Sequence, residues 1–445
     1  MFRSINERMS ADYTRLVFSP GYARIVDGLT RFKHALSSPG ANLMPHPLLF
    51  DLAEHAALSA ALRTILAAQQ KVVNAAMRRH GRESLMALMG LNPSWVPLVD
   101  WDQLTNGLYR TVRADVLATA DGLEICELNF SAAVGGFEMH EHFAVFARAL
   151  GLPAELGQDA PGHNMARMYA RNLAQSGHEC LHLLDWSTHA RMGYPSADIT
   201  RQWLAQELPG FPIEVHDELS WQRARRAGTG MRTLVHRRFT YDDVTENAEV
   251  YREMLDSGVT FSNGLEAELL MSKAWLALLW EPGYRQLLTP EEIAAIDAWV
   301  VPTALVGPDD RERVTAMKDT LLFKKKAGYG GKDAIIGREA PVAELWALLE
   351  RDGLDSWVSQ PLRHVPDLVH MAHGTLRPTA HCTVLGLYMY EGTACGLAVR
   401  SATGSRVVNA GSGASSAWAP ALDGLQRDAF SEAVRRFSRL SQPYN

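Results

Sequence analysis

The feature that most constrains the fold is a pair of short β-strand patterns joined by a tight turn. The segments YRTVRADVLA (109–118) and LEICELNF (123–130) flank Thr119-Ala120-Asp121-Gly122, a composition typical of a hairpin turn. Side chains on a strand alternate between the two faces of a sheet. Pairing centred on the turn places position 115 opposite 127 and position 113 opposite 129, if no bulge shifts the register.

This pairing predicts four polar side chains on one face of the hairpin: Arg113, Asp115, Glu127 and Asn129. The other face is mostly apolar and is expected to be buried, although Glu124 departs from that pattern. Two carboxylates and an amide oxygen suit Mg²⁺, and a neighbouring guanidinium can hold a phosphate oxygen. A surface hairpin with an ordinary Arg–carboxylate ion pair explains the same spacing, so the pattern alone leaves both interpretations open.

A second segment combines lysines with glycines. The stretch KKKAGYGGK (324–332) follows the apolar LLF and precedes AIIG, which predicts a strand, a glycine loop and another strand. Glycines let backbone N–H groups approach phosphate oxygens, and lysines supply positive charge. The Walker A pattern GxxxxGK[ST] is absent. A plain hairpin with solvated lysines fits this stretch about as well.

The rest of the chain mixes helices and strands without a strict βαβ alternation, so we expect an α+β (mixed α/β) fold. Residues 52–79 predict a helix capped by Asp51. Residues 160–240 suggest an α/β segment, and two strands are expected at 381–390 and 394–401. A length of 445 residues suits two or three domains or one large enzyme.

Charge and composition argue against several classes of protein. Lys and Arg number 44 against 50 Asp and Glu, a formal net charge of −6, which disfavours nucleic acid or an anionic membrane as the main partner. Four scattered cysteines without a CxxC pair indicate neither a zinc ribbon nor a disulfide framework. No secretory signal and no apolar run of about 18 residues is visible, so we expect a cytoplasmic protein.

Taken in order, these segments resemble the circularly permuted ATP-grasp superfamily, in the branch similar to glutathionylspermidine synthase. The first hairpin and the glycine loop carry the most specific part of the resemblance. The matching stretches are RADVLATADGLEICELN (113–129), LVHRRF (234–239), NGLEAELLMSKAWLALL (263–279), FKKKAGYGGKDAIIG (323–337), WVSQPL (357–362) and LGLYMYEGTACGLAVR (385–400). The first hundred residues are not covered.

The resemblance implies a circularly permuted ATP-grasp fold with four parts. Residues 1–104 would form a helical N-terminal region, and residues 105–158 the first part of the grasp with its metal-binding hairpin. Residues 159–242 would form an α/β substrate domain similar to a pre-ATP-grasp domain. Residues 243–445 would form the remainder of the grasp, including the nucleotide loop.

The resemblance also implies an ATP-dependent ligase that joins a carboxylate, such as an amino acid or small peptide, to an amine. Phosphorylation by ATP converts the carboxylate into an acyl phosphate with a good leaving group, and the amine then displaces phosphate. Charge develops on the transferred phosphoryl group, so metal ions and cationic side chains must be placed in advance. A phosphotransferase and a non-catalytic nucleotide-binding scaffold remain the alternatives.

Site residues follow from the resemblance position by position. Asp115, Glu127 and Asn129 match Mg²⁺ ligands, for what we expect to be two ions, and Arg113 and Arg400 match arginines at the acyl and transferred phosphates. The ATP contacts are expected from Lys273, Lys324, Gly330, Gly331, Lys332 and Gln360. Lys325 stands where relatives often carry Pro, so it and Lys326 compete with Lys324 for the ATP contact. Arg237 and Arg238 could bind a substrate carboxylate or form an internal ion pair.

Overall fold

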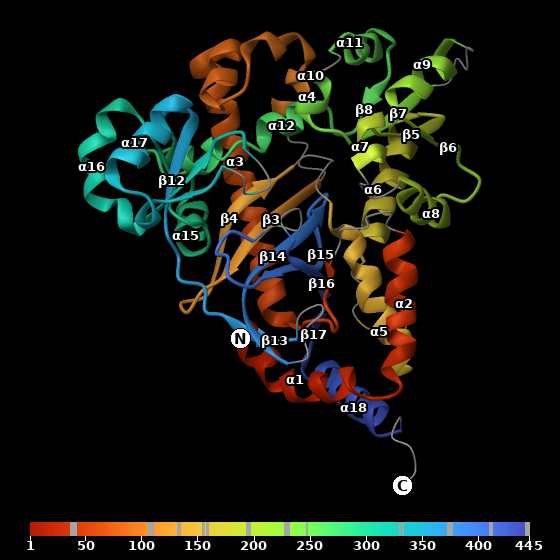
Figure 1. Cartoon of the computed structure of the whole chain (residues 1–445). Coiled ribbons are helices and arrows are strands. Elements are labelled where there is room, and N and C mark those ends of the chain that lie inside the picture. The colour runs from red at the N-terminus through yellow and green to blue at the C-terminus, as the bar shows by residue number, and fades with distance from the viewer. Residues whose placement is uncertain are drawn as a thin grey trace.

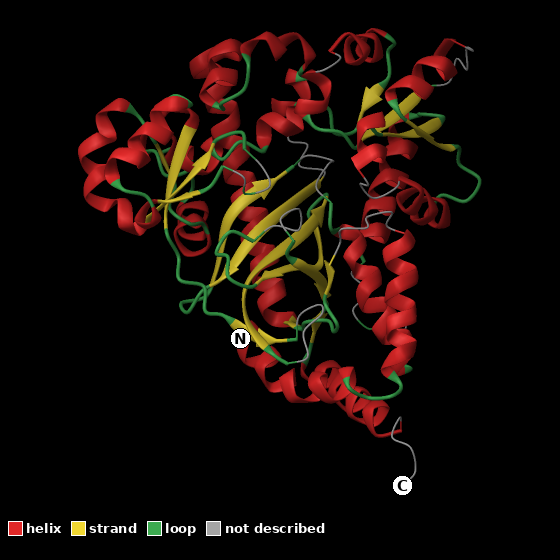
Figure 2. Ribbon diagram, in the orientation of Figure 1, coloured by secondary structure: helices red, strands yellow, loops and turns green. Residues whose placement is uncertain are grey.

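The structure, a computed structural model, has a mixed α/β architecture in which three large sheets are each packed by helices (Figure 1, Figure 2). It describes residues 1–35, 42–105, 111–130, 135–153, 156, 160–192, 197–226, 232–245, 248–328, 331, 333–371, 377–408 and 413–440. The largest sheet lies at the centre, with the sheet of β10 and β12 on one side of it and the sheet of β5 to β8 on the other (Figure 1). The predicted mixed class is therefore confirmed.

The largest sheet has seven strands, in the order β1-β16-β15-β14-β3-β4, with β13 also paired to β14. Its strands are β1 (Asn42–Leu43), β3 (Thr111–Ala118), β4 (Leu123–Asn129), β13 (Leu368–His370), β14 (Thr379–Tyr390), β15 (Thr393–Ala402) and β16 (Ser415–Ala419). Except for the parallel pair β1–β16, neighbouring strands are antiparallel. The two expected strands at 381–390 and 394–401 are confirmed as β14 and β15.

A second sheet has the order β11-β10-β12-β9 and carries the strand that leads into the glycine loop. Its strands are β9 (Ala304–Leu305), β10 (Leu321–Lys325), β11 (Ile335–Ile336) and β12 (Trp357–Pro361). It has a small apolar core of its own, in which Phe323 and Trp357 pack with Leu345 and Leu349 of a neighbouring helix. This core stabilises a sheet separate from the central one, and β10 of that sheet leads into the glycine loop.

The third sheet is parallel, with the order β6-β5-β7-β8. Its strands are β5 (Cys180–Leu184), β6 (Ile213–His216), β7 (Thr233–Arg237) and β8 (Thr260–Phe261). Leu181 and Leu183 pack toward one group of helices, whereas Leu184 and Val235 belong to the main core. Such burial on both faces is expected of a parallel sheet, and it confirms the α/β segment predicted for residues 160–240.

Helices surround these sheets. The α-helices before the central hairpin and up to the parallel sheet are α1 (Phe2–Val17), α2 (Tyr22–Ala35), α3 (Leu52–Leu88), α4 (Trp101–Thr105), α5 (His140–Leu150) and α6 (Pro161–Ser176). Those that follow are α7 (Ser187–Met192), α8 (Ala197–Glu207), α9 (Glu218–Arg226), α10 (Tyr241–Thr245), α11 (Ala248–Asp256), α12 (Glu266–Leu270), α13 (Ala274–Leu278), α14 (Pro282–Arg285), α15 (Pro290–Trp299), α16 (Arg311–Met317), α17 (Val342–Arg351) and α18 (Gly424–Leu440). Short 3₁₀ turns are η1 (Pro93–Leu98), η2 (Phe137–Met139), η3 (Pro308–Asp310), η4 (Lys318–Thr320), η5 (Gly337–Glu339) and η6 (Leu354–Ser356).

Helix α3 matches the helix expected over residues 52–79. The carboxylate of Asp51 accepts hydrogen bonds from the backbone N–H groups of Ala53 and Glu54, as an N-cap does. At Gly81 the backbone leaves helical geometry, with φ +72° and ψ 177°, values that glycine tolerates far better than other residues. The first helical segment therefore ends close to the predicted position.

The N-terminal region is built into the rest of the molecule. Strand β1 pairs with β16, and β2 (Phe50–Asp51) pairs with β17 (Ala421–Leu422), so residues near the start complete sheets formed by residues near the end. Side chains of α3 and of the apolar face of the central sheet share one core. The four-part division of the chain stays a prediction. Among the described residues, no helix is both long enough and apolar enough to cross a lipid bilayer.

Candidate active site

The hairpin of β3 and β4 has the predicted register where its polar residues lie. Arg113 pairs with Asn129, and Asp115 pairs with Glu127, so these four side chains share one face of the central sheet. Val112, Ala114 and Val116 on the other face are completely buried in the main core. The sheet thus buries its apolar side and turns the polar group away from that core.

Strand β4 has a β-bulge at Cys126, next to Glu127 on the side of the turn. After the pair Asp115–Glu127, the register moves to Val116–Ile125, which leaves Cys126 without a partner on β3. The shift also places Glu124 opposite Leu117, on the same face as Asp115, which explains why Glu124 departed from the apolar pattern. The expected register was conditional on the absence of a bulge, and this bulge shifts it between Glu127 and the turn.

The bulge provides the contact between the hairpin and the second sheet. The Cys126 carbonyl oxygen accepts hydrogen bonds from Lys324 Nζ at 3.4 Å and from Gln360 Nε2 at 3.2 Å. Lys324 lies on β10 and Gln360 on the adjacent β12, and both side chains point to the same face because Leu322 pairs with Gln360 and Lys324 with Val358. Two residues predicted to contact ATP are thus held directly against the predicted metal-binding hairpin.

Asp115 is the most strongly paired carboxylate in the site. It receives two hydrogen bonds from Arg113, at 2.7 and 3.2 Å, and its Oδ2 lies 2.8 Å from Arg400 NH2. Burial alone raises the pKa of an aspartate, but the two guanidinium groups lower the pKa of Asp115 to about 2. Asp115 is therefore ionised at any ordinary assay pH.

Two residues that the sequence pattern did not single out complete this part of the site. Gly386 lies opposite Asp115 on β14, and a Cβ atom there would stand 2.9 Å from Arg113 Cδ. Tyr388 lies opposite Arg113, and both side chains donate hydrogen bonds to the Gly135 carbonyl oxygen. A glycine inside a strand commonly marks a close approach of another group, which is the signal that could have identified Gly386.

Glu127 pairs with a lysine from a distant segment. Lys273 stands between α12 and α13, and its Nζ lies 3.2 Å from Glu127 Oε1. The same ammonium group donates to the carbonyl oxygen of Gly328, and its backbone N–H donates to that of Lys326. Lys273 therefore connects the hairpin to the start of the glycine loop.

The three consecutive lysines point in different directions. Lys324 faces the hairpin, as described above. Lys325 is on the opposite face of β10, where its Nζ lies 3.2 Å from Asp352 and 3.5 Å from Asp333. Lys326 is buried, and burial lowers its pKa. Lys324 is accordingly the lysine of the three that shares the site with the hairpin.

Of the other residues predicted to contact ATP, the structure describes Gln360 and Gly331. Gln360 is buried, and its amide also donates to Thr303 Oγ1 at 2.9 Å. Gly331 has φ +69°, and a Cβ atom there would lie 2.6 Å from Val407. Gly330 and Lys332 lie outside the described residues. Contact of these groups with ATP stays a prediction.

The site has more positive than negative charge. Two carboxylates, Asp115 and Glu127, face four cationic groups, so the formal balance is +4 − 2 = +2. The four cations are Arg113, Lys273, Lys324 and Arg400. A buried or half-buried surplus of this kind favours binding of a polyanion. Asn129 is buried beside them, and its amide nitrogen donates to the Arg113 carbonyl oxygen, which leaves the amide oxygen as its acceptor atom.

Arg237 does not fit the substrate-binding role considered for it. Its side chain is fully buried and lies 2.8 Å from Glu268. The guanidinium also donates to the carbonyl oxygens of Asn263, Phe239 and Gly264. Because these internal partners occupy both terminal nitrogens and Nε, the structure supports the alternative of an internal ion pair.

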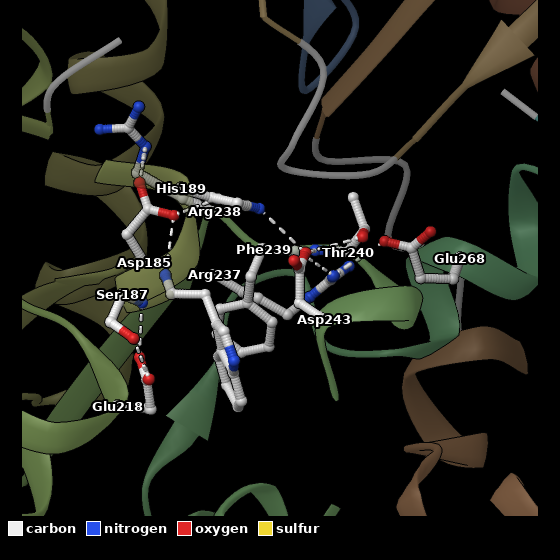
Figure 3. A network of polar contacts seen from close by, with 11 residues as sticks. Asp185, Ser187, His189, Glu218, Arg237, Arg238, Phe239, Thr240, Asp243 and Glu268 are labelled. Atoms are coloured by element: carbon white, nitrogen blue, oxygen red, sulfur yellow. Dashed lines mark hydrogen bonds and ion pairs between the residues drawn. The ribbon is translucent and has the colours of Figure 1, made fainter. Parts of the chain in front are cut away.

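Arg238 lies in a different environment, at the carboxyl ends of β5 and β7 (Figure 3). These strands flank the point where the order of the parallel sheet reverses, the usual ligand site in such sheets. Arg238 Nε is 3.8 Å from Asp185, which also contacts His189. Burial alone would lower the pKa of His189, but hydrogen bonds to Asp185 and Asp243 raise it to about 9. A charged network therefore occupies this edge of the sheet.

Arg238 is also electrostatically linked to the central site. Burial raises the pKa of Glu138, and the charge of Arg238 is among the groups that oppose this rise. Glu138 accepts a hydrogen bond from the backbone of Gly136, the residue after the Gly135 carbonyl that Arg113 and Tyr388 contact. A substrate carboxylate held by Arg238 stays a prediction, and the position is compatible with it.

Comparisons with known proteins show a shared fold at very low sequence identity. No protein-family model matches the sequence, and no curated protein matches it. Among solved structures, a glutathione synthetase-like effector from Globodera pallida is 12% identical, with a TM-score of 0.58 over 90% of this chain and 96% of that chain. The chain therefore has the overall fold of that effector.

A second solved structure overlaps more weakly. It is a protein from Methylobacillus flagellatus KT named as a candidate γ-glutamylcysteine synthetase, and it is 13% identical. The TM-score is 0.43, over 90% of this chain and 98% of that chain. A likeness of that size does not establish a common fold.

Proposed function

We propose that this chain is an ATP-dependent ligase that joins a small carboxylate to an amine through an acyl phosphate. One observation carries the proposal: Lys273 and Lys324, from two distant segments, meet the hairpin face that presents Asp115 and Glu127. Carboxylates that can hold metal ions, next to a surplus of positive charge, form the arrangement that a metal-bound triphosphate requires.

The protein's own groups account for the demands of phosphoryl transfer. Lys273 and Lys324 are placed to bind phosphate oxygens and reduce their mutual repulsion. Arg113 and Arg400 stand over Asp115 and can stabilise the negative charge that develops on the phosphoryl group and then on the tetrahedral oxyanion. Electrostatic stabilisation by groups held in advance is the main contribution expected in this chemistry.

The predicted magnesium ligands fit the ion chemically. Asp115, Glu127 and Asn129 offer carboxylate and amide oxygens on one face, within a single register of paired strands. Two Mg²⁺ ions held there would neutralise phosphate charge while ATP is bound. Asp115 and Glu127 are paired with Arg113, Arg400 and Lys273, so these three cations would have to turn to phosphate oxygens for the carboxylates to hold Mg²⁺.

The shared fold supports the proposal at the level of class. The effector from Globodera pallida is described as glutathione synthetase-like. The shared fold supports a synthetase-like function for this chain by analogy. The circularly permuted ATP-grasp order and the relationship to glutathionylspermidine synthase are part of the proposal. So are an amino acid or small peptide as the acid, a location in the cytoplasm, and the expectation that neither nucleic acid nor membrane is a partner.

The proposal is tested by a screen of ADP release. Purified protein is incubated with Mg²⁺, ATP and combinations of amino acids, small peptides and polyamines, and any product is identified by mass spectrometry. We expect ADP release that requires both an acid and an amine, together with an amide product. A phosphorylated product without an amide would indicate a phosphotransferase, and nucleotide binding without turnover would indicate a scaffold; either result contradicts the ligase.

Site-specific variants connect the activity to the hairpin. Glu127→Gln removes a carboxylate charge while preserving size, and we expect ADP release to fall at least about 100-fold. Asp121→Asn makes the same change of charge at the exposed turn of the same hairpin, and it should leave the rate unchanged. Equal rates for Glu127→Gln and the unmodified protein would contradict the assignment of the site.

A further inference from the structure

A cluster of potential metal ligands lies in the parallel sheet, outside the proposed ligase site. Cys180 and His182 alternate on β5, and Glu214 and His216 alternate on the edge strand β6. The strands are parallel, with His182 opposite Glu214, so all four side chains lie on one face of the sheet. Neither the proposed chemistry nor the apolar core uses them.

Three of these residues, Cys180, His182 and Glu214, have ligand atoms close enough to share one ion. One atom each from Cys180, His182 and Glu214 lies within 4.8 Å of the others. Glu214 Oε2 is 3.4 Å from His182 Nε2 and 2.8 Å from His216 Nε2. Adjacent ligands of a tetrahedral zinc ion are about 3.3–3.7 Å apart, given metal–ligand bonds of about 2.0–2.3 Å. Small side-chain adjustments are therefore enough to form a site.

The burial of the cluster also supports a metal-binding site. Cys180 is completely buried and His182 is 8% exposed, yet His182 Nδ1 has no hydrogen-bond partner among the described residues. Leaving a ring nitrogen buried and unpaired costs free energy, and an ion bound through Nδ1 would give this nitrogen a partner while Nε2 faces Glu214. The other side of the cluster is open to solvent at Glu214, whose side chain is 41% exposed, so an ion has a path of entry.

The donor set identifies the class of ion. A thiolate, an imidazole and a carboxylate suit Zn²⁺, whereas Mg²⁺ prefers oxygen ligands alone. We propose that Cys180, His182 and Glu214 bind one Zn²⁺ ion, with His216 hydrogen-bonded to Glu214 beside it. Three protein ligands leave the fourth tetrahedral position to solvent, on the side where Glu214 is exposed. The ion joins edge strand β6 to β5 in the sheet whose carboxyl ends carry Arg238.

Cobalt substitution tests the proposal through a signal that only a thiolate ligand gives. The full-length protein is stripped of metal, held in excess Mg²⁺ to occupy oxygen-only sites, and titrated with Co²⁺. We expect one equivalent of Co²⁺ to produce a thiolate-to-cobalt charge-transfer band, and Zn²⁺ to abolish it by displacement. Cys180→Ser should lack the band, whereas Cys382→Ser, which changes another buried cysteine, should retain it.

A variant at the exposed ligand keeps the test independent of folding. Glu214→Gln alters a half-exposed position, and it should weaken Co²⁺ binding at least about 10-fold while circular dichroism stays unchanged. Zn²⁺ should raise the melting temperature of the unmodified protein and not of Cys180→Ser. Absence of the charge-transfer band in the unmodified protein overturns the proposal, and so does a band that survives in Cys180→Ser.

Discussion

At the scale of single residues, the site is built around Asp115, whose carboxylate keeps its charge near neutral pH. Arg113 and Arg400 keep the pKa of Asp115 near 2, below its usual value. The stabilisation from this pairing is therefore present above the unfolded pKa of about 3.9 and is lost only as the pH falls toward 2. Any pH dependence of activity around neutrality has to come from another group or from the amine substrate.

Residue types and spacing were enough to predict which side chains share the hairpin face. Strand alternation alone brings together Arg113, Asp115, Glu127 and Asn129, because it depends only on local geometry. Alternation could not rank Arg237 against Arg238. Arg237 ends β7 and Arg238 follows it, and only the tertiary structure shows Glu268 beside the former and Asp185 beside the latter.

The neighbouring lysines provide a residue-scale prediction. Lys324→Ala should weaken binding of Mg·ATP about 10- to 100-fold, because a charge-assisted contact to phosphate is lost. Lys325→Ala should bind Mg·ATP normally, since that ammonium group pairs with Asp352 and Asp333 on the other face of β10. Calorimetric titration of both variants measures the difference. A larger loss in Lys325→Ala would show that the wrong lysine has been assigned.

At the scale of secondary structure, the bulge in β4 is the element that brings the two sheets together. An unpaired residue in a ladder has a carbonyl group free for other partners, and here that of Cys126 receives both Lys324 and Gln360. The neighbouring Ile125 carbonyl accepts from the backbone of Val301, just before β9. Cys126 itself does not mark the bulge, because its small apolar side chain suits an ordinary strand equally well, and the local signal is the departure of Glu124 from the apolar pattern.

A substitution at Gln360 tests this connection between the two sheets. Gln360→Met keeps the side chain near its size but removes the hydrogen bonds to Cys126 and Thr303, and it should lower the free energy of unfolding by about 1–3 kcal/mol. Urea denaturation gives the value. The exposed residue Gln286 provides the control, because Gln286→Met should change stability by less than about 0.5 kcal/mol. A Gln360→Met protein as stable as the control would mean that the bulge does not hold the sheets together.

At the scale of the whole molecule, distant parts of the chain complete each other's sheets. Strands β1 and β2 pair with β16 and β17, and Asp51 at the start of α3 forms an ion pair of 2.6 Å with Arg427 of α18. The sequence predicted helix α3 and its Asp51 cap from local pattern. It could not predict that two-residue strands near the start would add to sheets near the end, since pairing over such separation leaves no local signal.

The central claim is that the hairpin, Lys273 and Lys324 together hold a metal-bound triphosphate. A crystal structure of the full chain with Mg²⁺ and a non-hydrolysable ATP analogue tests it most directly. We predict electron density for the triphosphate between the carboxylates of Asp115 and Glu127 and the ammonium groups of Lys273 and Lys324. Nucleotide bound elsewhere, or no nucleotide at saturating concentration, would contradict the claim.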